Sequence, residues 1–77
     1  MTWKIIYPFY REYHKQEIAK TLALLSLFGV SCTKITFDRF RGDNALVLYI
    51  DRELSDKEAK MLHIKVWDYV EEEYIVM

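Results

Sequence analysis

The sequence predicts one small α+β domain, in which an antiparallel sheet carries two helices on one face. Three observations lead to this prediction: a β-hairpin pattern around Gly42, a helix-capping box that begins at Ser55, and an amphipathic helical stretch that ends at Gly29. A short strand precedes the first helix, so the elements follow the order β-α-β-β-α. With a short C-terminal strand added, this is the ferredoxin-like split βαβ pattern.

Length and composition limit the kind of protein that this chain can be. With 77 residues it has room for one domain, 1–77, around one core. A content of 52% hydrophobic and 30% charged residues is too apolar for a disordered chain and too interspersed with charge for a membrane protein. The longest apolar stretch, 22–30, is far shorter than the roughly 18 residues that span a bilayer. The first residues lack the features of a secretory signal, and Cys32 is the only cysteine, so we expect a cytoplasmic location.

The first half of the pattern is a strand followed by a helix. The strand covers 3–7 and ends before Pro8, which has no N–H for a sheet ladder. The helix starts near Arg11, without a typical N-cap residue, and ends at Gly29 in a left-handed conformation, with Val30 making the accompanying apolar contact. Its expected buried stripe consists of Ile18, Leu22, Leu25 and Phe28.

A β-hairpin is the clearest local signal. The runs 32–40 and 45–51 flank a turn at Gly42-Asp43, which places Phe37 opposite Leu48 and Ile35 opposite Ile50. A turn at Asp43-Asn44 shifts the partners by two and keeps the same faces. In either register, these four apolar residues belong to the core.

The second helix begins with a capping box, in which Ser55 accepts from the Glu58 N–H and Glu58 reaches back. Repulsion between 71–73 and the negative helix end favours a stop near Val70, after which 74–77 forms a short strand. If that strand frays, a three-stranded βαββα domain remains. The expected buried stripe of this helix consists of Ala59, Leu62, Val66, Tyr69 and Val70.

No group of residues indicates catalysis or a cofactor. His14, His63 and Cys32 lie in three separate predicted elements, and no His or Cys pair has the spacing of metal ligands. Two isolated glycines cannot form a phosphate-binding loop. We therefore expect a protein that is not an enzyme and that uses no metal, cofactor or small-molecule substrate.

Apolar residues in excess of the core favour a protein–protein interaction module. On the predicted second helix, Met61, Ile64 and Trp67 lie outside the buried stripe, so they are the expected binding surface for a protein partner or for a second copy of the chain. If the surface lies elsewhere, the aromatic and basic segment 7–15 is the next candidate. Small chains without chemistry are often accessory regulators or inhibitors encoded by phages, other viruses or mobile elements, an expectation that rests on size alone.

The alternative prediction is a module that binds single-stranded nucleic acid. Segment 7–15 interleaves rings with cations, and the open sheet face would add Tyr49. Residues 1–41 hold seven basic and three acidic side chains, whereas 42–77 hold four and nine. This asymmetry either polarises the surface, or folding intersperses the charges of the two halves into an even surface. Separately, the three glutamates 71–73 are either a solvated stretch or a mimic of nucleic-acid phosphates. The residues expected to contact nucleic acid are Tyr10, Arg11, Tyr13, Lys15 and Tyr49.

Overall fold

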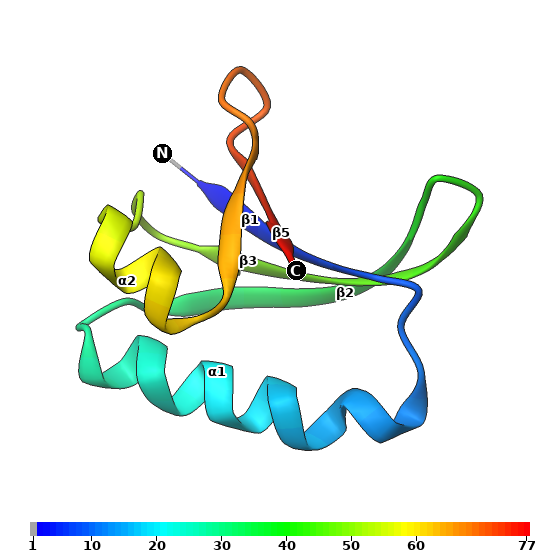
Figure 1. The fold of residues 1–77 in the computed structure, drawn as a ribbon, viewed down its shortest axis with the longest axis horizontal. Coiled ribbons are helices and arrows are strands. Elements are labelled where there is room, and N and C mark those ends of the chain that lie inside the picture. The colour runs from blue at the N-terminus through cyan, green and yellow to red at the C-terminus, as the bar shows by residue number, and fades with distance from the viewer. Residues whose placement is uncertain (1) are drawn as a thin grey trace.

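The computed structural model describes residues 2–77 and shows a five-stranded sheet with two helices on one face (Figure 1). The strand order is β2-β3-β1-β5-β4, and all neighbours are antiparallel except β1 and β5. The predicted α+β class is confirmed. The elements are β1 (Trp3–Pro8), a 3₁₀ turn η1 (Glu12–His14), α1 (Lys15–Leu27), β2 (Cys32–Phe40), β3 (Asp43–Ile50), α2 (Asp56–Met61), β4 (Ile64–Asp68) and β5 (Glu73–Val76).

The ferredoxin-like strand order is not confirmed. Two strands follow α2, where the split βαβ pattern has one. β5 lies beside β1 in parallel, and β4 forms the outer edge as the other half of a β4–β5 hairpin. In Figure 1 this hairpin stands across the direction of the long β2–β3 hairpin, which shows how strongly the sheet twists.

The central strand β1 supplies side chains to two separate apolar clusters. Trp3, Ile5 and Tyr7 face the helices and are at most 4% exposed. Ile6 points to the opposite face, where it packs with Ala45 and Val47 in a smaller cluster. The main core also contains Ile18, Leu25, Val30, Leu46, Leu48, Ile50, Leu54, Leu62, Ile64 and Tyr74.

α1 ends as predicted and begins later than expected. The 3₁₀ turn η1 replaces its first turn, and there the Arg11 N–H donates to His14 Nδ1 at 2.9 Å in place of a Ser or Asp cap. At the other end Gly29 has φ +75°, and the Val30 N–H donates to the Leu25 carbonyl at 2.8 Å. With the second bond from the Gly29 N–H to Ser26, this is a Schellman motif.

The hairpin is present, but its turn lies at Arg41-Gly42. Both residues have positive φ, +52° and +79°, which is the type I′ conformation that suits a two-residue hairpin. Phe37 therefore lies opposite Leu46 and Ile35 opposite Leu48, two positions from the predicted partners. Shifts of two residues preserve the faces of both strands, so Leu48 is still fully buried.

The prediction that Ile35 and Phe37 belong to the core is wrong. They point to the helix side of the sheet but are 50% and 77% exposed. β2 forms an edge of the sheet, so these side chains have neighbours on one flank only.

The prediction of a long second helix is also wrong. α2 ends at Met61, and His63, at φ +56°, turns the chain into β4. From there burial alternates, because Ile64 is buried, Lys65 is exposed and Val66 is half-buried. Tyr69 and Val70, expected in the buried stripe of a helix, are exposed in the β4–β5 turn.

The predicted capping box is confirmed, and Arg52 extends it. The Glu58 N–H donates to Ser55 Oγ at 3.2 Å, and the Ser55 N–H donates to the Glu58 carboxylate at 2.9 Å. Both terminal nitrogens of Arg52 donate to the same carboxylate at 3.0 Å, and one also donates to the Phe28 carbonyl at 2.9 Å. Arg52 thus connects the start of α2 to the end of α1. The hydrogen bonds that Glu58 accepts from Arg52 and from the Ser55 N–H lower its pKa to about 2.

Glu58→Gln should lower the free energy of unfolding above about pH 5 and have little effect near pH 2. A carboxyl group with a lowered pKa in the folded state stabilises the protein above its unfolded pKa of about 4.3, and this contribution is lost as the pH falls through about 2. Urea unfolding at several pH values should therefore show parent and variant diverging at pH 7 and converging near pH 2. An equal gap at both pH values would contradict the assignment.

Tyr74→Phe should destabilise the fold by about 1–3 kcal/mol, because it leaves a buried N–H without a partner. The Tyr74 hydroxyl accepts from the Leu54 N–H at 2.8 Å, and its ring, 1% exposed, packs on Trp3 at 4.8 Å between centroids. The matched control is Tyr13→Phe, which changes a side chain 78% exposed and should alter stability by less than about 0.5 kcal/mol. Denaturant unfolding of the three proteins measures both effects.

Candidate functional site

The most unusual surface of the molecule is the open edge of β2. This strand has nine residues and pairs with β3 alone, so its other side presents a row of backbone N–H and C=O groups. No residue of β2 is fully buried. The opposite edge, β4, is shorter, with five residues and a register irregularity between Val66 and Asp68. Short length and bulges are common protections of sheet edges, and β2 has neither along 34–40.

Exposed aromatic and aliphatic side chains gather beside this edge. Phe37 lies with its ring 5.8 Å from that of Tyr10, and Ile35 follows on the same face of the strand. Tyr13, 78% exposed, lies next to His14, whose ring also approaches Tyr10. We refer to Tyr10, Tyr13, Ile35 and Phe37, together with the open backbone of β2, as the β2 edge surface.

The flank of α1 that faces away from α2 carries residues of several sizes. Glu17, Thr21 and Leu24 line a pocket on the α2 side of the helix. At 100° per residue, the positions opposite to them are Lys15, Ala19, Leu22 and Ser26. α1 runs beneath β2 in Figure 1.

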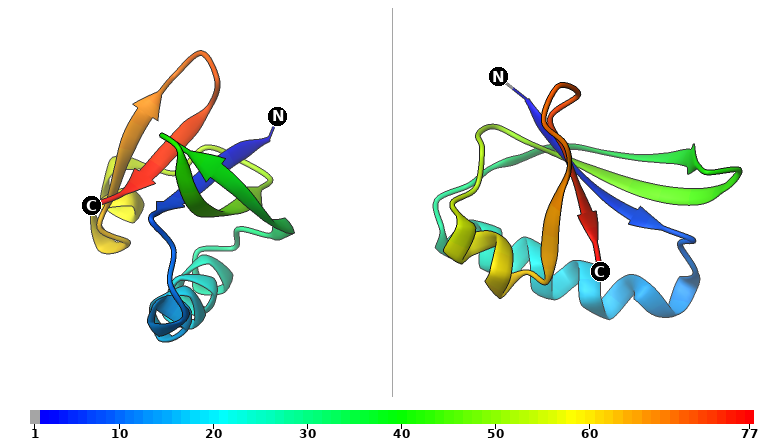
Figure 2. Two further views of the ribbon diagram at one scale, coloured as in Figure 1. Left: turned by 90° about the vertical axis from the view of Figure 1, so that its right-hand side faces the viewer. Right: turned by 45° about the horizontal axis from the view of Figure 1, so that its top comes forward.

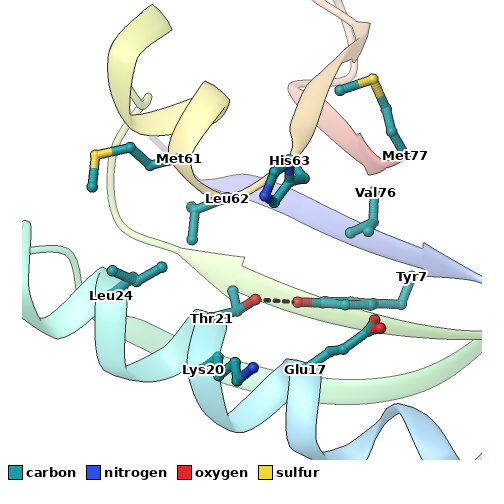
Figure 3. Close-up of a pocket in the computed structure, with 10 residues that line it drawn as sticks. All are labelled: Tyr7, Glu17, Lys20, Thr21, Leu24, Met61, Leu62, His63, Val76 and Met77. Carbon is teal, nitrogen blue, oxygen red and sulfur yellow. Dashed lines mark hydrogen bonds between the residues drawn. The ribbon is translucent and has the colours of Figure 1, made fainter.

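The pocket between α1 and α2 has a volume of about 440 Å³ and is open to solvent (Figure 3). Its one buried polar pair is the Tyr7 hydroxyl with Thr21 Oγ1, and burial raises the pKa of that phenol. One of these hydroxyls donates to the other, so each uses one of its hydrogen-bonding sites within the pair. Glu17, Lys20 and His63 lie at its rim, with no hydrogen bond among them in the part of the chain that the structure describes.

The sheet face without helices is partly closed by aromatic side chains. Phe40 and Trp67 come from strands at opposite edges of the sheet, yet their rings are 5.6 Å apart, and the Arg41 guanidinium lies 4.5 Å from the Trp67 ring. The strong twist of the sheet, visible in Figure 2, brings these edges toward each other. Beneath them Ile6 is 4% exposed, so this face is not the flat open surface that the sequence suggested.

The predicted protein-binding set is not one surface. Ile64 is 3% exposed and belongs to the main core, which excludes it from a binding surface of the folded chain. Met61 lines the pocket beside α1, and Trp67 lies with Phe40 on the other face of the sheet. The prediction placed all three on one helix face, and it was wrong because β4 begins at Ile64 and alternates faces at every residue.

The predicted nucleic-acid set is divided as well. Tyr10, Arg11, Tyr13 and Lys15 lie around the start of α1, whereas Tyr49 lies on the sheet face without helices. Two of the cations already have acidic partners, since Arg11 contacts Asp43 at 3.5 Å and Lys15 contacts Glu12 at 2.8 Å. Tyr49 instead has Lys34, whose Nζ is 5.4 Å from the ring centre.

The residues considered for metal binding or catalysis remain apart. His14 caps η1, His63 forms the α2–β4 turn, and Cys32 is a free thiol at the start of β2. Within residues 2–77, no group of three or more His, Cys, Asp or Glu side chains could hold a metal ion. No helix in this range is long and apolar enough to cross a membrane.

Sequence reasoning missed Ile35 and Phe37 as surface residues, because an alternating strand looks the same at an edge as in the middle of a sheet. One available signal was the opposite face of that strand, where Lys34, Thr36 and Asp38 alternate with them. Two-sided exposure of this kind is typical of edge strands. No protein-family model matches the chain, and comparison with curated proteins and with solved structures gives no match.

Proposed function

We propose that this protein is a non-enzymatic protein–protein interaction module that binds through the β2 edge surface. The observation that carries this proposal is the nine-residue edge strand with Ile35 and Phe37 exposed on it. A partner strand added to such an edge gains backbone hydrogen bonds along its whole length, and side-chain contacts on each face give specificity.

The side chains around the edge have the composition of a binding surface. Aromatic residues are enriched at protein interfaces because they bury a large area with little loss of side-chain freedom. Tyr10, Tyr13 and Phe37 supply three such rings within one neighbourhood. A partner strand along β2 would cover Ile35 and Phe37 and would leave the core of the domain unchanged.

A binding role through one strand edge suits an accessory regulator or inhibitor, which acts by occupying a surface of its partner. The small size of the chain is the support for a viral, phage or mobile-element origin. Its lone free thiol, Cys32, is compatible with a reducing compartment such as the cytoplasm.

A second candidate function is binding of single-stranded nucleic acid on the sheet face without helices. Its support is the pairing of cations with rings there, Arg41 above Trp67 and Lys34 beside Tyr49. Rings stack on bases and cations contact phosphates. Binding of an oligonucleotide that weakens steeply with salt, and that is lost in Trp67→Ala but kept in Phe37→Lys, would favour this function over the first.

Phe37→Lys should abolish binding to a protein partner while leaving the fold intact. The side chain is 77% exposed, so its replacement should alter stability by less than about 0.5 kcal/mol, whereas a charge in the centre of an interface costs several times more in affinity. The parent and the variant are compared by quantitative affinity capture from the native host, with circular dichroism to verify folding.

The matched control for that comparison is Val70→Lys, which places the same charge at a site 89% exposed in the β4–β5 turn. A partner that is lost with Phe37→Lys and retained with Val70→Lys supports the proposal. Partners captured equally by all three proteins would show that β2 is not the binding edge.

A further inference from the structure

We propose that the partner of the β2 edge is a second copy of this chain, and that the two β2 strands pair antiparallel around a two-fold axis at Thr36. The inference rests on the proposed function, because it names the partner of the same surface. The resulting dimer would contain one continuous sheet of ten strands, five from each copy.

The backbone of β2 is arranged for this pairing. In a two-residue hairpin the residues that flank the turn, here Phe40 and Asp43, form a hydrogen-bonded pair, and bonded and non-bonded pairs then alternate along the strands. The odd-numbered residues of β2 therefore direct their N–H and C=O groups to the open side. The Arg39 N–H takes no part in the β2–β3 ladder, as this alternation requires; it donates to the side chain of Asp38 at 2.8 Å, a bond that it would exchange for one to the partner strand.

The side-chain sequence of β2 is self-complementary around Thr36. In an antiparallel pair centred there, Lys34 lies opposite Asp38 of the partner subunit, and Asp38 lies opposite Lys34 of the partner subunit. Ile35 lies opposite the partner's Phe37 on the other face, and the odd-numbered positions meet as hydrogen-bonded pairs, as the free backbone groups require. Regular alternation in β2 begins after the register irregularity between Cys32 and Lys34, so the pairs of this register run from Lys34 to Asp38.

Other two-fold registers are less favourable. A centre at Lys34 or at Asp38 places two like charges directly opposite each other. A centre at Ile35 or at Phe37 removes both Lys–Asp pairs. Centres between residues would pair an odd with an even position, where the free backbone groups do not meet.

The Thr36 hydroxyl gives a second, independent indication of the centre. Its Oγ1 is buried and has no hydrogen-bond partner among residues 2–77. At the two-fold axis the two Thr36 residues would form a non-hydrogen-bonded pair, the closer type of cross-strand site, where Thr–Thr hydroxyl bonds are common. Rotation of this side chain toward the axis would give each hydroxyl the partner that it lacks in the single chain.

The helices of the two copies would share one face of the dimer. An axis perpendicular to the sheet places α1 and its copy on the same face, on either side of the two β2 strands. Between the helices and the sheet, Ile35 and Phe37 of the two copies would cover each other.

Charge reversal tests both the pairing and its register. Lys34→Asp and Asp38→Lys each place two like-charged pairs in the dimer, so each variant alone should dimerise about tenfold or more weakly than the parent in sedimentation equilibrium. An equimolar mixture of the two variants restores opposite charges at both positions and should form a heterodimer. The double variant, with both changes in one chain, should dimerise like the parent, and Lys57→Asp on α2 is the matched control.

Dimerisation of the parent, its loss in each single variant and its recovery in the mixture would support the proposal. A parent that stays monomeric at all concentrations would overturn it. So would a mixture of the single variants that stays monomeric while the double variant dimerises. The proposed function can hold even if the dimer does not. If the chain is monomeric and Phe37→Lys loses a host partner, the β2 edge binds another protein, and only the self-pairing is wrong.

Discussion

The parallel pairing of β1 with β5 is the constraint on which the rest of this structure depends. Ile5 lies beside Tyr74 in this pairing, and both are at most 1% exposed. β3 and β4 both run antiparallel to this pair of strands, so they are parallel to each other, and the chain between them must cross the sheet through α2. β4 then takes the outer edge, which uses the residues after His63 for a strand and leaves α2 with six residues. The short second helix is thus a consequence of the sheet topology.

Polar side chains connect the two helices and the last strand at one end of the sheet. Arg52 joins α1 to α2 through the Phe28 carbonyl and the Glu58 carboxylate, and Tyr74 joins β5 to the segment before α2 through both backbone groups of Leu54. Both contacts lie at the end of the sheet where α2 begins. At the other end of α1, the half-buried Tyr10 ring contacts His14 and Phe37. The Tyr10 N–H also donates to the Asn44 carbonyl at 2.9 Å, and Arg11 contacts Asp43 at 3.5 Å.

The sequence allowed prediction of those features that depend on neighbouring residues. Gly29 and Val30 form the Schellman motif, Ser55 and Glu58 form the capping box, and Gly42 forms the hairpin turn, because each depends on local backbone geometry. The stretch from Ile64 to Trp67 was misread as helix, since a short apolar run satisfies both periods and its pairing partner, β5, is defined only by the tertiary fold. The exposure of Phe37 was missed because edge position is a property of the whole sheet, although the polar residues Lys34, Thr36 and Asp38 on the opposite face of the strand indicate an edge.

The two edges of this sheet differ in a way that connects topology to function. β4 is short, irregular and shielded on one side by the contact of Trp67 with Phe40, which are common means of preventing unwanted pairing. β2 is long and carries exposed apolar residues, but its charges are not distributed like those of a blocked edge. A blocked edge repels any strand, whereas Lys34 and Asp38, two residues on either side of Thr36, disfavour the registers centred on either of them and complement the register centred at Thr36. Such charges therefore select a partner strand, and the strand that they fit is β2 itself.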